Sequence, residues 1–93
     1  MTPQAAEPIE DVLCSKTRIR IVKLLNDLGQ LNVSDMVERL GSNYAYVLRN
    51  LVVLEKSDLV TRLRSGRVKY FRLNRESLKI RALQNMLDTW AEK

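Results

Sequence analysis

The chain has 93 residues, of which 45% are hydrophobic and 29% are charged, with three glycines and two prolines. This length allows one small domain, and the composition excludes disordered and collagen-like chains. No apolar run exceeds four residues, far short of the ~20 residues of a membrane span, and the first residues do not have the pattern of a secretory signal. We therefore expect a cytoplasmic protein.

The histidine and cysteine content limits the chemistry that the chain can perform. It contains no histidine and one cysteine, Cys14. Catalytic Ser-His and Cys-His pairs and Cys/His zinc sites are therefore excluded, and the isolated glycines do not form a phosphate-binding loop. We expect no enzyme activity, no cofactor and no metal. Cys14 alone is compatible with a small buried hydrophobic residue or with a redox-sensitive thiol.

Basic residues are concentrated in one segment. The whole chain carries 16 basic and 11 acidic residues, a net charge of +5, whereas residues 62–81 hold eight basic residues and one acid, a net +7. A small basic domain without catalytic groups typically binds a polyanion.

The N-terminal third predicts a tail and two helices. Residues 1–8 hold both prolines, so we expect a flexible tail there and a single domain over 9–93. Apolar spacings of three and four predict a short helix from Ile9 to about Cys14 or Ser15. They also predict a second helix that Gly29 ends and that buries Ile21, Leu24, Leu25 and Leu28.

Residues 32–56 have the pattern of a helix-turn-helix. Asn32 is placed to cap a helix that ends at Gly41, and Ser42 to cap a second helix over about 43–56. So short a joint makes the two helices cross steeply. The second helix is expected to face inward with Val47, Leu48, Leu51 and Leu54.

The apolar period then changes from 3.6 to 2. Residues 59–64 and 68–73 read as two strands joined at Gly66, which together form a hairpin over 59–73. A last helix over 75–91 carries an apolar seam that needs a partner surface to persist.

Two motifs point to a known family. Residues 15–25, SKTRIRIVKLL, resemble the S-x-T-R-x-R-I-L-x-L-L opening of ArsR-type bacterial and archaeal repressors. Asp58-Leu59-Val60 and residues 64–73 are similar to their G-L-V and R-x-G-R-x-x-Y-Y-x-L wing. The resemblance covers about residues 9–90. It implies a winged helix-turn-helix, mainly α with a β-hairpin wing (α+β), in the order α-α-(short β)-α-α-β-β-α.

The resemblance also implies an assembly and a function. Such domains form homodimers through their terminal helices, and we expect a sequence-specific regulator of transcription, in the simplest case a repressor, bound to double-stranded DNA at the nucleoid. Metal-sensing members carry Cys-x-Cys where this chain has Asn32-Val33-Ser34. We therefore do not expect metal sensing.

Three groups of residues are expected to carry this function. Helical geometry and groove chemistry assign base reading to Asn43, Tyr44, Ala45, Tyr46, Arg49 and Asn50. The charge of the hairpin assigns contacts with the DNA backbone or minor groove to Arg62, Arg64, Arg67 and Lys69. The apolar faces of the first and last helices assign the dimer interface to Ile9, Val12, Leu13, Ile80, Leu83, Leu87 and Trp90.

Two other readings remain open at this point. An architectural, chromatin-type protein would bind DNA without sequence preference, and the charge of the hairpin suffices for that role. A winged-helix module for protein interaction would instead use an apolar patch made of Tyr44, Tyr46, Val52 and Val53.

Overall fold

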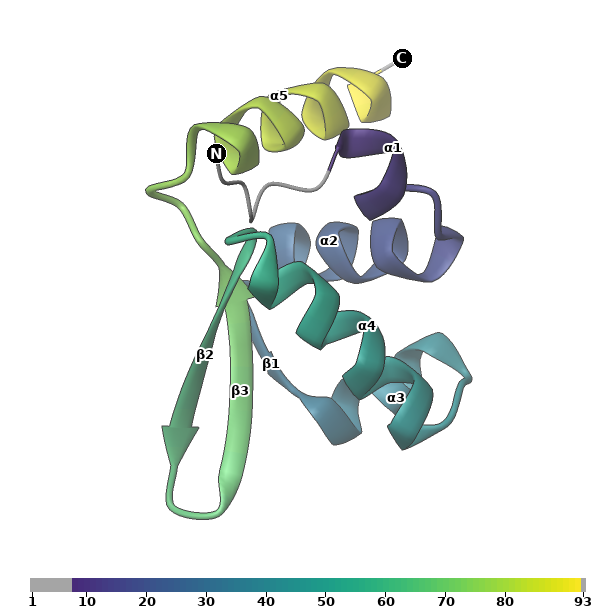
Figure 1. Cartoon of the computed structure of the whole chain (residues 1–93), viewed down its shortest axis with the longest axis vertical. Coiled ribbons are helices and arrows are strands. Elements are labelled where there is room, and N and C mark those ends of the chain that lie inside the picture. Colours follow the sequence, from purple (N-terminus) through teal and green to yellow (C-terminus); the bar gives the residue numbers. More distant parts are fainter. Residues whose placement is uncertain (1–7, 93) are drawn as a thin grey trace.

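The computed structural model describes residues 8–92, so residues 1–7 of the expected tail lie outside the described part. The described residues form five helices and three strands in the expected order (Figure 1). Their bounds are α1 Ile9–Val12, α2 Lys16–Leu28, β1 Gln30–Asn32, α3 Val33–Leu40, α4 Tyr44–Lys56, β2 Val60–Ser65, β3 Val68–Leu73 and α5 Leu78–Glu92. No helix in this part of the chain is long and apolar enough to cross a membrane.

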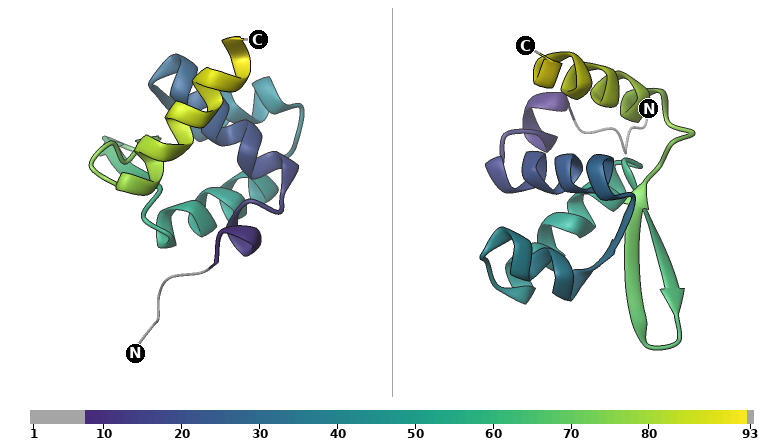
Figure 2. Two further views of the ribbon diagram at one scale, coloured as in Figure 1. Left: turned by 90° about the horizontal axis from the view of Figure 1, so that it is seen from above. Right: turned by 180° about the vertical axis from the view of Figure 1, so that it is seen from behind.

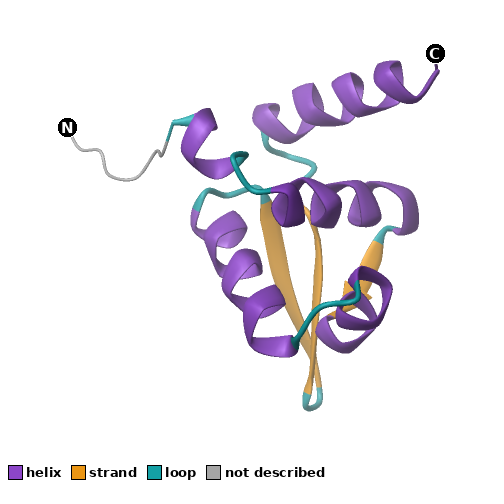
Figure 3. Ribbon diagram, turned by 90° about the vertical axis from the view of Figure 1, so that its right-hand side faces the viewer, coloured by secondary structure: helices purple, strands orange, loops and turns teal. Residues whose placement is uncertain are grey.

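The strands form an antiparallel sheet in the order β1-β3-β2. The short strand β1 pairs with β3, where Leu31 lies opposite Phe71, and so joins the helix-turn-helix to the hairpin. The hairpin extends past the helices at one end of the molecule, whereas α1 and α5 lie at the other end (Figures 1 and 3).

Two helix boundaries differ from the expected ones. Helix α1 ends at Val12, before Cys14, and α5 begins at Leu78 rather than at residue 75. Residues 74–77 form a turn instead, in which the Ser77 amide donates to the Asn74 carbonyl oxygen at 3.0 Å. The Ser77 hydroxyl then accepts from the Ile80 amide at 3.4 Å, which caps the start of α5.

The core lies between α2, α3, α4 and the sheet, and its largest fully buried side chain is Phe71. The face of α2 was predicted only in part. Ile21 and Leu25 are buried as expected, but Val22 is also buried, and Leu28 is 48% exposed. Val22 is buried because α2 is covered on two sides. Helix α5 crosses it (Figure 2), and an Asn26 to Asp88 hydrogen bond of 3.2 Å fastens the two helices together.

Side-chain caps set the geometry of the helix-turn-helix. The Asn32 side chain accepts from the Asp35 amide at 2.8 Å, which confirms the predicted cap, and Gly41 ends α3 in the left-handed conformation with φ 64°. The expected cap of α4 is wrong by one residue. Asn43, not Ser42, accepts from the Tyr46 amide, at 2.8 Å.

Asp58 holds an unusual backbone conformation where α4 meets β2. Its φ is 63°, the only positive value outside glycine in the described chain. The Leu59 amide donates to the Leu54 carbonyl oxygen at 2.9 Å and the Asp58 amide to that of Glu55 at 3.0 Å. This is the hydrogen-bond pattern of a Schellman cap, in which glycine usually takes the left-handed position.

Replacing Asp58 with glycine is expected to stabilise the protein. Glycine adopts positive φ without steric cost, whereas an aspartate there is strained, so the free energy of unfolding should rise by about 0.5–1 kcal/mol. Thermal unfolding followed by circular dichroism should show a midpoint higher by a few degrees. Asp58→Ala serves as the control, since it removes the same carboxylate without relieving the strain. An equal rise in both variants would contradict the explanation.

Candidate nucleic-acid interface

The outward face of α4 carries most of the predicted base-reading residues. Ala45 and Arg49 are exposed, and the exposed fractions of Tyr44 and Tyr46 are 48% and 38%. Asn43 is also exposed, although its side-chain oxygen is occupied by the helix cap. A helix with such a face can enter the major groove and place these side chains against base edges.

Tyr46 reaches from α4 toward the start of α2. A hydrogen bond with the Thr17 side chain is the largest cause that lowers the pKa of Tyr46 below the ordinary value of 10.0, and burial, the next largest cause, acts in the opposite direction. Asn50, Ser15 and Arg18 lower this pKa further. Tyr46 is thus influenced by residues at the start of α2 while 38% of it stays exposed.

Asn50 does not lie on the outward face, which corrects one predicted base-reading residue. Its side chain is only 4% exposed. The Asn50 oxygen accepts from Arg18 Nε at 2.9 Å, and its nitrogen donates to the Tyr46 carbonyl oxygen at 2.9 Å. Both ends of the amide are thus occupied within the protomer, and Asn50 is unable to read a base.

The wing presents its charges at the tip and along one face. Gly66, with φ 63°, occupies the first central position of the two-residue turn, where a type II′ turn requires positive φ. Arg64 lies directly opposite Lys69, and Arg67 is exposed in the turn. A hollow of about 240 Å³ separates this tip from the helix-turn-helix; its lining is Asn32, Val33, Ser34, Tyr44, Arg67, Val68 and Lys69.

Arg62 was predicted to contact DNA, but its side chain contacts other residues of the same chain. Its Nη2 lies 3.0 Å from a carboxylate oxygen of Glu55, near the end of α4, and its guanidinium lies 5.1 Å from the centre of the Phe71 ring. Arg62 therefore fastens the base of the wing to α4. The register places it two residues farther from the turn than Arg64, where α4 covers the sheet.

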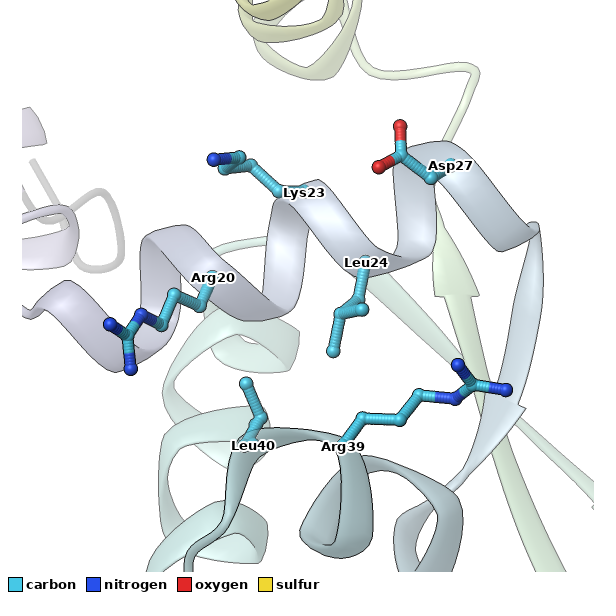
Figure 4. A pocket seen from close by; sticks show the side chains of 6 residues that line it. All are labelled: Arg20, Lys23, Leu24, Asp27, Arg39 and Leu40. Atoms are coloured by element: carbon cyan, nitrogen blue, oxygen red, sulfur yellow. The ribbon is translucent and has the colours of Figure 1, made fainter.

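A second group of basic residues lies between α2 and α3. Arg20, Lys23 and Arg39 line a hollow of about 250 Å³ together with Leu24, Asp27 and Leu40. Figure 4 shows the two leucines directed toward each other and the end of Arg39 directed away from those of Arg20 and Lys23. These charges do not converge on one point, so they do not form an anion site.

The terminal helices expose an apolar surface. A groove of about 320 Å³ runs between α1, α5 and the end of α4, and its lining is Ile9, Val12, Leu13, Ser57, Leu59, Lys79, Ala82, Leu83 and Met86. Exposed apolar side chains continue this surface, with Ile9 at 66%, Met86 at 51% and Trp90 at 82%.

Two of the predicted interface residues belong to the core instead. Val12 is 4% exposed and Ile80 is fully buried, because each packs inside its own protomer. Leu13, Leu83 and Leu87 are half-buried at the edge of the core. Cys14 is exposed, which excludes its interpretation as a small buried hydrophobic residue; its thiol donates to the Asp11 carbonyl oxygen at 3.4 Å.

The position that holds metal-binding thiols in metal-sensing relatives does not fit a metal here. Asn32 is occupied as the cap of α3, and neither Val33 nor Ser34 offers a thiolate. Across residues 8–92, no three His, Cys, Asp or Glu side chains gather at a point where they could share an ion.

The sequence match agrees with this architecture. A family model described as bacterial regulatory protein, arsR family, matches residues 15–62, which is more than half of the chain. The chain belongs to the arsR family. Its members are regulatory proteins, which agrees with the expectation that this chain is not an enzyme.

A curated relative supports the assignment to the arsR family. The arsenical resistance operon repressor of Escherichia coli (strain K12) is 33% identical over 63 residues, which cover 68% of this chain and 54% of the relative. This arsR-family chain thus matches about half the length of that repressor.

Solved structures share the fold. HlyU from Vibrio cholerae N16961 superposes with a TM-score of 0.77 at 19% identity, covering 89% of this chain and 87% of that one. The homodimeric winged helix-turn-helix DNA-binding domain from Mycobacterium bovis, solved by NMR, gives 0.73 at 21% identity and covers 99% and 91%. The predicted winged helix-turn-helix is confirmed.

The most informative residue that sequence reasoning missed in this arsR-family chain is Arg18. On helical periodicity alone, Arg18 is one of several basic residues of α2 that could face solvent or a phosphate. The structure turns it inward, where it donates to Asn50 and to two carbonyl oxygens of α1. The sequence signal that could have found it is the T-R step of the family motif.

Proposed function

We propose that this chain is a homodimeric repressor of transcription that binds double-stranded DNA by sequence, with residues 9–93 acting as one DNA-binding domain. The observation that carries the proposal is that the domain has two separate surfaces of different chemistry. The exposed face of α4 and the basic wing tip lie apart from the apolar surface of α1 and α5. One surface suits a nucleic acid, and the other suits a second copy of the chain.

Base reading rests on α4 in the major groove. Arg49 has the geometry for a bidentate contact with guanine, Asn43 can donate to an acceptor on a base edge, and Ala45 can meet a thymine methyl group. Tyr44 and Tyr46 add contact area on the same face. Asn50 is left out of this group because its amide is buried and occupied.

Contacts with the DNA backbone rest on the wing tip. Arg64, Arg67 and Lys69 are proposed to bind phosphates or to enter the minor groove, and Arg62 is left out because Glu55 and Phe71 hold it. With α4 in the major groove, such contacts fix the orientation of the protomer on the duplex.

The dimer is proposed to form through Ile9, Leu13, Leu83, Leu87 and Trp90, together with Met86. The fold relative from M. bovis is described as homodimeric, which supports the same assembly here. Two recognition helices related by a two-fold axis would read a pseudo-palindrome with half-sites about 10 bp apart or a multiple of that distance. Such an assembly would act at the nucleoid.

Selection from a random duplex pool at near-physiological salt, followed by sequencing, tests the proposal. Enrichment of a two-fold symmetric motif is the expected result. Salt-sensitive binding without enrichment would favour an architectural protein instead. Absence of binding would favour a protein-interaction module that uses Tyr44 and Tyr46.

Arg67→Ala is expected to weaken binding to every duplex by a similar factor. Arg67 is exposed at the wing tip and is proposed to neutralise one phosphate, so its loss should make the negative slope of log affinity against log salt less steep by about one. Fluorescence anisotropy titrations over a series of salt concentrations measure this slope. Arg62→Ala, which removes a positive charge from the same hairpin, should leave the slope nearly unchanged. A slope change of equal size in both variants would count against the assignment.

A further inference from the structure

A chain of hydrogen bonds runs from α1 to the recognition helix through a single side chain. Arg18 Nη1 donates to the carbonyl oxygens of Asp11 and Val12, each at 2.9 Å, and Arg18 Nε donates to the Asn50 oxygen at 2.9 Å. Arg18 belongs to α2, so one guanidinium joins three helices. At one end of this series of hydrogen bonds lies α1, which borders the apolar groove, and at the other end lies α4.

The geometry at both ends is specific. Asn50 Nδ2 donates to the Tyr46 carbonyl oxygen one turn earlier in α4, and this contact fixes the amide with its oxygen toward Arg18. The two α1 carbonyl groups lie at the C-terminal end of that helix, where a positive charge is favoured. A planar guanidinium with donors on two sides serves both ends at once, which a lysine ammonium does not.

Breaking this link would leave polar groups of α1 and α4 without their shared hydrogen-bond partner. Asn50 is 4% exposed, so its oxygen would be left without water or a partner if Arg18 were removed. The carbonyl groups of Asp11 and Val12 would lose their shared donor in the same step. A displacement of α1 would therefore shift Arg18 and, through Asn50, the turn of α4 that carries Tyr46 and Arg49.

We infer that Arg18 and Asn50 are positioning residues that couple assembly of the dimer to the placement of the recognition helix. This inference rests on the proposed function for its DNA side and on the α1 and α5 surface for its dimer side. When a second copy fixes α1, Arg18 holds α4 in the orientation that reads bases. By thermodynamic reciprocity, a bound specific duplex strengthens the dimer by the same factor.

The test compares Arg18→Met with Arg20→Met. Both changes remove one positive charge from α2, but Arg20 is exposed and donates none of the side-chain hydrogen bonds found among residues 8–92. Well below the unfolding temperature, Arg18→Met is expected to bind the selected duplex about tenfold more weakly than Arg20→Met. Binding to an unselected duplex should be equal in the two variants. A loss of stability alone would not change this ratio between fully folded proteins.

A second readout needs no DNA. Amide hydrogen exchange in α4 is measured across the protein concentrations at which the unmodified chain dimerises. We expect protection of residues 46–50 to rise with dimerisation in the unmodified and Arg20→Met chains and to stay constant in Arg18→Met. If Arg18→Met does not fold, Asn50→Leu takes its place, since it removes only the α4 end of the link and keeps both bonds to α1.

The outcomes separate this inference from the proposed function. If the unmodified chain selects no duplex, the proposed function fails, and the exchange experiment alone decides the inference. Equal affinities of Arg18→Met and Arg20→Met for a selected duplex overturn the coupling. The coupling is also overturned if amide hydrogen exchange in α4 follows dimerisation in Arg18→Met. It is overturned as well if the unmodified chain stays monomeric at every concentration.

Discussion

Met86→Glu is expected to convert the proposed homodimer into folded monomers. Met86 is 51% exposed in the protomer and lines the apolar groove between α1 and α5, as well as a smaller hollow beside Leu13, Leu83 and Leu87. In a two-fold interface the change occurs twice, so each dimer would bury two unpaired carboxylates. An unpaired buried charge costs about 3 kcal/mol or more, so the two charges together raise the dissociation constant of the dimer by about 10,000-fold or more.

Sedimentation equilibrium measures the dimer, and anisotropy measures the effect on DNA. Because a monomer engages one half-site, binding of Met86→Glu to a duplex with two half-sites should fall to the level of a duplex with one. Asn85→Glu is the matched control, since it adds the same charge at an exposed neighbour that lines neither hollow. A dimer that survives in Met86→Glu would show that the chain assembles through another surface.

Arg49→Ala is expected to remove most of the preference for a selected sequence. Arg49 is exposed on the outward face of α4, and no hydrogen bond or ion pair within the described residues holds its side chain. A bidentate contact between arginine and guanine contributes about 1–3 kcal/mol of discrimination. The selected duplex should therefore lose about 5- to 150-fold in affinity, whereas an unselected duplex should lose only the small effect of one charge.

Competition titrations of selected against unselected duplexes measure this difference, and repeating the selection with the variant shows which position of the motif is relaxed. Arg20→Ala removes the same charge from α2 and should keep the preference. Equal losses on both duplexes would mean that Arg49 contacts phosphate rather than a base. That result would move the base-reading role to Asn43 and Tyr44, at the start of the helix.

The two predictions together separate the alternative functions. An architectural protein would lose affinity in both variants through charge and assembly, without any change in sequence preference. A protein-interaction module would be insensitive to Arg49 in DNA titrations, because it would not bind DNA in the first place. Its proposed patch is uneven in the structure, since Tyr44 and Tyr46 are exposed while Val52 and Val53 are half-buried.

Local features of this protein could be read from the sequence because their causes are local. The cap at Asn32, the left-handed glycine at Gly41 and the tight hairpin at Gly66 each depend on a few neighbouring residues and on the conformations that those residues allow. Apolar periodicity likewise depends only on the spacing of side chains along one helix or strand, and so the order of the elements was predictable except for the short strand β1, which only the family resemblance implied.

The roles of Arg18, Asn50 and Arg62 were decided by the tertiary structure. All three are polar residues in amphipathic elements, and a helical or strand period alone describes each of them as facing solvent or DNA. Arg18 pairs with a residue 32 positions later, and Arg62 lies against Phe71 on the neighbouring strand. Long polar side chains can bury their stems and satisfy their charged ends inside a fold, and the partners that allow this are not their neighbours in sequence.

The same reason separates the core from the candidate interface on the terminal helices. The spacing of Ile80, Leu83, Leu87 and Trp90 predicts one apolar seam, and the sequence by itself determined that this seam needs a partner. Only the packing of α5 across α2 decided that Ile80 is buried within its own protomer while Trp90 remains exposed. Periodicity determines which side chains share a face, whereas the angle at which two helices cross determines how much of that face is already covered.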